Sequence, residues 1–158
     1  LLYDVLVKGQ FTVTQKGVEV MRKQGFGGDV LNIVSKNALV SGPNNAGYGS
    51  AKAAQLHLSR LNAAELGKEK IRVNVVNPDA VISGSNIWSG GWAEGRAKAY
   101  GIKVEELPAY YASRTLLNEI ILPEDIANAC FAFVGGLLNK STGNVLNVDG
   151  GVATAFVR

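Results

Sequence analysis

Short apolar runs alternate with longer helical patterns along the chain, and this alternation most limits its possible folds. Residues 29–35 (Asp-Val-Leu-Asn-Ile-Val-Ser) follow two glycines and are predicted to form a fully buried strand. The remaining patterns predict strands over 71–77 and 144–148, and helices over 4–24, 48–66 and 123–135. Strands that alternate with helices build a parallel sheet with crossover helices, so we expect an α/β fold.

The first helix and the segment after the second strand carry further expectations. The helix over 4–24 ends at Gly25, and its buried face is predicted to contain Val5, Val13, Val18 and Met21. Residues 79–121 lack a sustained pattern and are predicted to form an irregular excursion. No linker divides the chain, so residues 1–158 are expected to belong to one domain.

Composition excludes several classes of protein. No apolar stretch approaches the eighteen or more residues of a spanning helix, so no membrane segment is predicted. The net charge is +3, but the sixteen basic residues are scattered, which argues against nucleic-acid binding. The single cysteine, Cys130, lies in an apolar run and is expected to be buried without a disulfide. A reducing, cytoplasmic compartment is therefore expected.

Tyr48 and Lys52 suggest acid–base chemistry. In a helix they are four residues apart and share one face. Free tyrosine titrates near pH 10, and a neighbouring cation lowers its pKa towards that of a useful general base. Ser35, at the carboxyl end of the first predicted strand, lies where parallel sheets bind their ligands and could polarise the same substrate oxygen. A serine at a strand end can also simply bind a loop backbone.

Other chemistries have little support in the sequence. His57 is the only histidine and is expected on a helix surface or in helix packing. No Cys/His cluster predicts a metal site, and Glu105-Glu106 is expected to be a solvated helix start.

Four ordered motifs resemble the short-chain dehydrogenase/reductase family. The first joins Leu31-Asn-Ile-Val-Ser35 to Tyr48 and Lys52. The others are Ile71-Arg-Val-Asn-Val-Val-Asn-Pro78, Leu122-Pro-Glu-Asp-Ile-Ala127 and Thr142-Gly-Asn-Val-Leu-Asn-Val-Asp-Gly-Gly151. The stretch from Asn77 to Trp92 further resembles the dehydrogenase domain of bifunctional rhamnulose-phosphate aldolase/lactaldehyde dehydrogenase proteins.

The resemblance implies the C-terminal part of a Rossmann-like, doubly wound parallel sheet, with strands 1–4 of the family absent. No Gly-x-Gly-x-x-Gly follows a strand pattern, so the pyrophosphate cradle is missing from this sequence. NAD or NADP is the implied cofactor, and we expect this chain alone not to bind it. The missing part would also carry the residues that distinguish the two nucleotides.

The resemblance also assigns roles to residues. Lys52 would contact the nicotinamide ribose, and the loop after the second strand would contact the nicotinamide through Pro78, Asp79, Ala80, Val81 and Ser83. Asp79 stands where the family usually has glycine. In the family an asparagine precedes the Ser-Tyr-Lys set and helps to anchor a relay water, but this chain has Leu6 at that position.

Trp88, Trp92 and Arg96 are candidate substrate contacts, because long insertions at this position cover substrates in the family. Their content suits a hydroxylated or phosphorylated small molecule, although the tryptophans could equally form a buried stripe within the excursion.

Two functions follow. The first is an NAD(P)-dependent oxidoreductase of small hydroxy/carbonyl compounds, with lactaldehyde as the substrate by resemblance. The alternative is a catalytically silent fragment that acts in assembly. In both cases we expect a homo-oligomer through helices 4–24 and 48–66, because the family pairs these helices across a two-fold axis.

Overall fold

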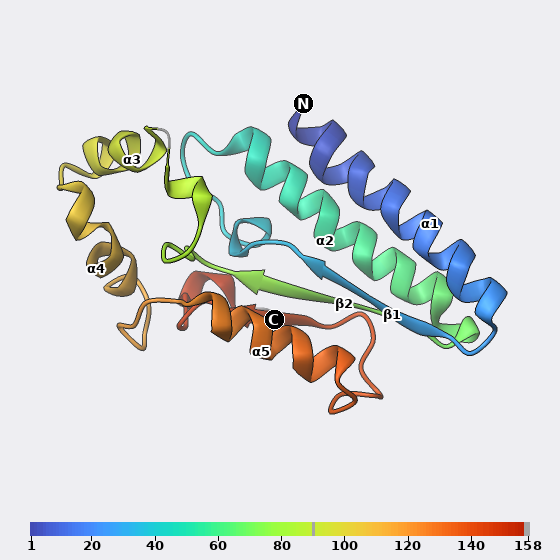
Figure 1. Ribbon diagram of the computed structural model, residues 1–158. Coiled ribbons are helices and arrows are strands. Elements are labelled where there is room, and N and C mark those ends of the chain that lie inside the picture. The colour runs from blue at the N-terminus through green and yellow to red at the C-terminus, as the bar shows by residue number, and fades with distance from the viewer. Residues whose placement is uncertain (90, 157–158) are drawn as a thin grey trace.

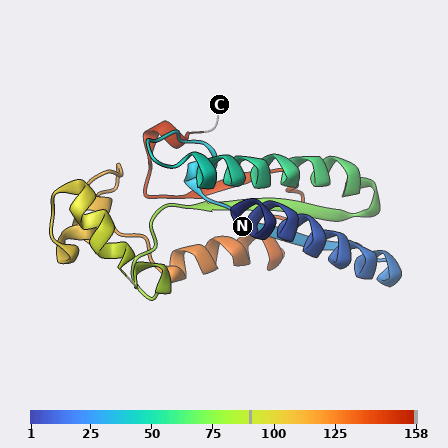
Figure 2. The same ribbon diagram turned by 90° about the horizontal axis from the view of Figure 1, so that it is seen from above.

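A parallel sheet of three strands forms the centre of the molecule (Figures 1 and 2). The computed structural model describes residues 1–89 and 91–156. The strands are β1 (Gly28–Ile33), β2 (Ile71–Pro78) and β3 (Val145–Val148), in the order β1-β2-β3. Gly28 is level with Ile71, and Asn77 is level with Asn147. The predicted α/β fold with parallel strands is confirmed.

Helices cover both faces of the sheet. The helices α1 (Gly9–Gln24) and α2 (Ala46–Leu66) lie on one face, and α5 (Pro123–Val134) lies on the other (Figure 2). Alternate residues of β2 enter the two cores: Val73 packs against Val18 and Leu66, while Val76 packs against Phe133. The central strand is therefore buried on both faces.

The prediction that β1 is fully buried is wrong. This strand is only half-buried, and Ile33 is 46% exposed. The physical reason is its place in the sheet: within the described residues β1 pairs with β2 alone, which leaves its other edge open.

The first predicted helix has two parts. A π-helix (Tyr3–Lys8) precedes α1, and the Gly9 N–H donates to the carbonyl of Asp4. Val18 is buried, but Val5 and Val13 are 61% and 73% exposed, so the predicted buried face is wrong in its first half. These two valines line a groove beside the open edge of β1, where no described segment covers them.

Residues 79–121 form a helical lobe rather than an irregular excursion, and that prediction is also wrong. The lobe contains α3 (Trp92–Tyr100) and α4 (Leu107–Ala112) and lies at the carboxyl ends of the strands (Figure 1). Ala93, Ala97 and Leu107 form its core. Short 3-10 helices occur at Lys36–Ala38, Gly67–Glu69, Asn86–Trp88, Val104–Glu106 and Ala153–Ala155.

The remaining general expectations have mixed outcomes. Across residues 1–89 and 91–156, no helix is long and apolar enough to span a bilayer. Cys130 is a free thiol that is half-buried rather than fully buried, and burial raises its pKa. His57 is exposed on α2, as expected for a helix-surface residue.

Candidate functional site

Ser35 is held firmly at the carboxyl edge of the sheet, two residues after β1. Its side chain is buried, and its Oγ accepts a hydrogen bond from the Asn37 N–H at 3.2 Å. Its own N–H donates to Oδ1 of Asn77, also at 3.2 Å. Ser35 thus caps the 3-10 helix that follows and takes its position from the neighbouring strand.

Tyr48 and Lys52 lie one turn apart near the start of α2, as predicted. The Lys52 Nζ is 5.7 Å from the centroid of the Tyr48 ring and donates to the carbonyl of Ile33 at 3.4 Å. Lys52 is buried, and burial lowers its pKa. The structure therefore places a buried cation between the tyrosine and the end of β1.

Packing between α2 and the segment after β1 brings the predicted residues to one place. The carbonyl of Asn37 lies 3.5 Å from where a side chain on Gly49 would begin. The start of α2 therefore lies in van der Waals contact with the segment that follows Ser35. Ser35, Tyr48 and Lys52 consequently gather at the carboxyl edge of β1, where open parallel sheets bind ligands.

Two linked asparagine side chains that the sequence did not reveal support this edge. Asn77 is fully buried, and its Nδ2 donates to Oδ1 of Asn147 at 3.3 Å. The Nδ2 of Asn147 donates in turn to the carbonyl of Ala155 at 2.8 Å. Asparagine is unusual inside a strand. The occurrence of asparagine in both β2 and β3 was the sequence signal that could have revealed these contacts.

Lys36 is a second residue that sequence reasoning missed. Its Nζ lies 3.2 Å from Oδ1 of Asp79, and the two side chains are only 6% and 7% exposed. The ion pair joins the segment after β1 to the loop after β2. Asp79, which the resemblance marked as a departure from glycine, therefore has a buried cationic partner.

The loop after β2 is fixed from the lobe side as well. The Nε1 of Trp88 donates to the carbonyl of Val81 at 2.9 Å, and Val81 forms an isolated parallel bridge with Ile121. Ser83 is exposed, while Pro78 is half-buried. The predicted contacts of this loop with a nicotinamide stay predictions.

The candidate substrate residues lie in the lobe with different exposures. Trp88 is half-buried, with its ring edge-on to Trp92 at 4.6 Å and to Tyr111 at 5.3 Å between centroids. The guanidinium of Arg96 lies 4.7 Å from the Trp92 ring centroid. Trp88 and Arg96 are half-buried in the lobe, whereas Trp92 is 37% exposed. The contact of these three residues with substrate stays a prediction.

Leu6 lies in the π-helix, and its backbone carbonyl accepts a hydrogen bond. The Nε2 of Gln55 donates to the Leu6 carbonyl at 2.7 Å, and Gln55 is buried on α2 one turn beyond Lys52. A glutamine on the facing helix therefore binds the backbone at the position where the resemblance expects asparagine.

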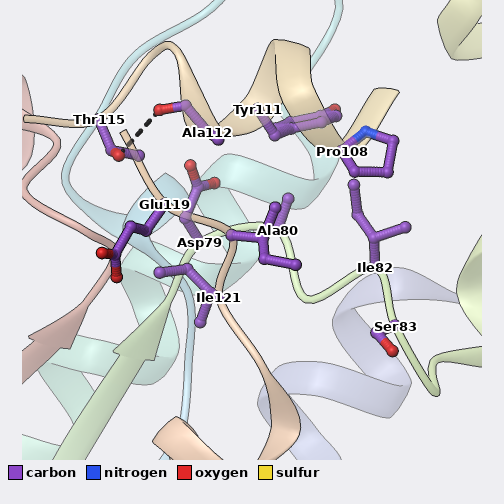
Figure 3. A pocket seen from close by; sticks show the side chains of 11 residues that line it. Asp79, Ala80, Ile82, Ser83, Pro108, Tyr111, Ala112, Thr115, Glu119 and Ile121 are labelled. Atoms are coloured by element: carbon purple, nitrogen blue, oxygen red, sulfur yellow. Dashed lines mark hydrogen bonds between the residues drawn. The ribbon is translucent and has the colours of Figure 1, made fainter. Parts of the chain in front are cut away.

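A small cavity of about 130 Å³ lies between the loop after β2 and α4 (Figure 3). It is lined by Asp79, Ala80, Ile82, Ser83, Pro108, Tyr111, Ala112, Thr115, Glu119, Ile120 and Ile121. Burial is the main cause that raises the pKa of Tyr111, and a hydrogen bond with Tyr100 raises it further. The phenol of Tyr111 is therefore neutral at physiological pH.

The assignment of Lys52 and residues 78–83 to a nicotinamide and its ribose stays a prediction. The Ser35–Asn77 hydrogen bond and the Lys36–Asp79 ion pair hold the start of the loop after β2 beside the segment that follows β1. No glycine-rich strand–turn–helix for a pyrophosphate occurs among the described residues. That part of the chain also contains no group of three or more potential metal ligands.

A parallel sheet flanked by helices on both faces, with serine, tyrosine and lysine at its carboxyl edge, is of the Rossmann-like class. The family model described as enoyl-(acyl carrier protein) reductase matches residues 1–153. The chain therefore belongs to this family of short-chain dehydrogenases/reductases.

Individual relatives agree with this assignment. An uncharacterised oxidoreductase of Bacillus subtilis, YuxG, is 45% identical over 155 residues, which are 98% of this chain and 22% of the relative. An L-rhamnose 1-dehydrogenase (NAD(P)(+)) of a Sphingomonas species is 29% identical over 95% of this chain and 54% of the relative. The crystal structure of sorbitol-6-phosphate 2-dehydrogenase SrlD from Erwinia amylovora is similar, with a TM-score of 0.84 and 25% identity, over 97% of this chain and 59% of that one. The chain thus spans between about a fifth and three-fifths of these relatives.

Proposed function

We propose that the chain supplies the catalytic part of a nicotinamide-dependent oxidoreductase that acts on a small hydroxy/carbonyl compound. The observation that carries the proposal is the position of Lys52, whose buried Nζ lies 5.7 Å from the Tyr48 ring and 3.4 Å from the end of β1. A buried ammonium beside a phenol is typical of a functional site, where the two groups act together.

The three side chains have separate roles in this proposal. Tyr48 gives a proton to the substrate oxygen during reduction and takes it back during oxidation. Lys52 holds its ammonium beside the Tyr48 ring, 5.7 Å from the ring centroid. Ser35, fixed by Asn77, donates a hydrogen bond to the same substrate oxygen.

The cofactor role is part of the proposal. When bound, a nicotinamide supplies or accepts the hydride. Lys52 would bind its ribose, and Pro78, Asp79, Ala80, Val81 and Ser83 would line its nicotinamide end. The name of the Sphingomonas relative supports NAD or NADP, and the choice between them stays open. Lactaldehyde is the substrate that the sequence resemblance supports, and the single cysteine supports a cytoplasmic location.

The test places these 158 residues in a complete protein. A chimera in which they replace the matching segment of YuxG is assayed for NADH- and NADPH-dependent reduction of lactaldehyde. We expect activity in the chimera and a loss of about 10²- to 10⁴-fold in kcat on Tyr48→Phe, which removes the acid–base group. Tyr3→Phe, an exposed tyrosine in the π-helix, is the matched control. A folded chimera in which Tyr48→Phe keeps full activity would overturn the proposed role.

The same question can be asked of the chain alone. Calorimetric titration with NADH and NADPH is expected to show no tight binding. The reason is that the described residues contain no glycine-rich strand–turn–helix to bind the pyrophosphate. Tight, saturable binding would contradict our proposal that these residues alone do not hold the pyrophosphate.

A second function is favoured by one observation, the open edge of β1. This edge, with the exposed Val5 and Val13 in the groove beside it, could make the chain an assembly module without catalysis. A homo-oligomer through the first helical segment and α2 is common to both functions. An inactive, folded chimera that still assembles would favour the assembly function.

A further inference from the structure

Two arginines of the lobe act on one phenol, that of Tyr111. The guanidinium of Arg114, two residues after α4, lies 5.2 Å from the centroid of the Tyr111 ring. Arg96 comes from α3. Burial is the main effect on the pKa of Tyr111 and raises it, whereas the positive charges of Arg96 and Arg114 lower it. Neither arginine lines the cavity beside Asp79. Two segments of the lobe therefore bring positive charge to one place outside that cavity.

Aromatic rings hold both guanidinium groups. That of Arg96 lies 4.7 Å from the centroid of the Trp92 ring. That of Arg114 lies 5.9 Å from the Tyr110 centroid, in addition to its contact with Tyr111. A guanidinium that stacks on a ring uses its face, so the N–H groups at its edge are left for an acceptor. The rings also restrain the two long side chains, which reduces the entropy lost when a ligand orders them.

Neither guanidinium has a carboxylate partner within the described part of the chain, where the ion pairs involve other cations. Arg22 and Arg72, by contrast, each pair with a carboxylate at 2.6 Å. Arg96 is half-buried and Arg114 is exposed, so solvent reaches both. Two positive charges without acidic partners attract anions to this part of the lobe.

The phenols add a neutral donor at the same place. The hydroxyls of Tyr100 and Tyr111 lie 3.3 Å apart, and one donates to the other. Each hydroxyl has one proton, so the pair uses one O–H group and leaves the second to donate elsewhere. Tyr100 also stacks on Tyr110, with ring centroids 4.5 Å apart, which fixes its position. Guanidinium and hydroxyl donors in one place suit a ligand that has several acceptor oxygens and a negative charge.

We propose that Arg96 and Arg114 form an oxyanion site in the lobe, which binds a phosphate or carboxylate group with a tyrosine hydroxyl as a further donor. The planar edge of a guanidinium matches the paired oxygens of both groups, and arginine is over-represented where they are recognised. This inference goes beyond the proposed function, because the site contains none of Ser35, Tyr48 and Lys52 and requires no nucleotide.

The test titrates the 158-residue chain with inorganic phosphate, glycerol phosphate and lactate, and with glycerol as the neutral control. The side-chain Nε–H resonances of Arg96 and Arg114 are followed by nuclear magnetic resonance. We expect saturable shifts of both resonances with an anion and none with glycerol. The anion that binds most tightly identifies the source of the oxyanion as free phosphate, a phosphate ester or a carboxylic acid.

Variants separate a built site from general attraction by charge. Arg96→Gln and Arg114→Gln should each weaken binding of that anion at least about tenfold, the loss of one charged hydrogen bond. Arg114→Lys keeps the charge but not the planar edge, so it should also bind more weakly than the parent chain. Lys98→Gln removes one positive charge from an exposed position of α3 and should bind as the parent does.

Two kinds of result would overturn the proposal. One is the absence of saturable shifts with all three anions in the folded parent chain. The other is equal binding by the arginine variants and Lys98→Gln, with circular dichroism used to confirm that each variant is folded. Because the titration contains no nucleotide, its outcome does not depend on the oxidoreductase proposal, and loss of activity in the chimera would leave the oxyanion site unaffected.

Discussion

The backbone N–H of Ser35 donates a hydrogen bond of 3.2 Å to Oδ1 of Asn77, 42 residues further along the chain. One side chain on β2 thus positions the residue that follows β1. Because Asn77 also binds Asn147 on β3, the carboxyl ends of all three strands are joined through one buried amide.

This relationship predicts a specific loss of stability. Asn77→Ala leaves the Ser35 N–H and the Asn147 amide without their buried partner, so we expect the free energy of unfolding to fall by about 1–3 kcal/mol. Urea denaturation followed by circular dichroism measures the change. Asn128→Ala, at an exposed position of α5, is the control and should shift stability by no more than about 0.5 kcal/mol. Equal effects of the two substitutions would contradict the positioning role.

Lys52 predicts a dependence of stability on pH. Burial lowers its pKa below the ordinary value of 10.5, so the folded chain releases this proton at lower pH than the unfolded chain. The unfolded state then binds more protons, and the contribution of Lys52 to stability rises as the pH climbs from the folded-state pKa towards 10.5.

Lys52→Met should remove that dependence and raise the melting temperature near neutral pH, because a buried ammonium is exchanged for an apolar chain of similar length. Thermal unfolding at several alkaline pH values tests this, with the exposed Lys98→Met as control. A lower melting temperature for Lys52→Met at neutral pH would show that the buried ammonium stabilises the fold.

The Lys36–Asp79 pair predicts strong coupling between two substitutions. Lys36→Met or Asp79→Leu alone leaves one buried charge without its partner and should cost about 3–5 kcal/mol. The double variant should recover most of that loss, since it buries no charge. A double-mutant cycle in urea measures the coupling, and additive losses would mean that the two side chains act independently.

Substitution of Gly27 and of Gly17 by alanine should change the stability of the chain in opposite directions. Gly27 has φ +86°, and a side chain there would collide with the carbonyl of Lys70. Gly27→Ala should therefore destabilise the chain by about 1–3 kcal/mol or more. Gly17 lies within α1 with open space around it, so Gly17→Ala should stabilise by about 0.5–1 kcal/mol. Melting temperatures that move in the same direction for both variants would contradict the difference.

The first helical segment and α2 predict self-association. Phe11 is 51% exposed on α1, and Phe11→Glu should shift the chain towards monomer in light scattering at micromolar concentrations. Val104→Glu, an exposed apolar position in the lobe, should leave the assembly unchanged. A parent chain that is a monodisperse monomer would contradict the expected oligomer.

The elements with strong local signals were predictable from the sequence. The β2 strand is rich in valine and isoleucine, α2 follows the chain breaker Pro43, and α5 begins at Pro123. Tyr48 and Lys52 could be placed on one helix face because their spacing alone determines it.

Long-range packing explains what the sequence did not reveal. The helices α3 and α4 have a core of small residues, Ala93 and Ala97, with Leu107, which gives a weak apolar period. The exposure of β1 depends on its place at the sheet edge. The Lys36–Asp79 ion pair joins residues far apart in sequence, and no spacing rule predicts such a contact.

The position of Trp88 has a practical consequence for optical experiments. The chain has two tryptophans, Trp88 and Trp92, and both lie in the lobe. Since the Trp88 indole binds the carbonyl of Val81, its emission is a native reporter of the contact between the lobe and the loop after β2. Intrinsic fluorescence will therefore follow the lobe and its loop, while unfolding of the sheet and of α1 must be followed by another signal.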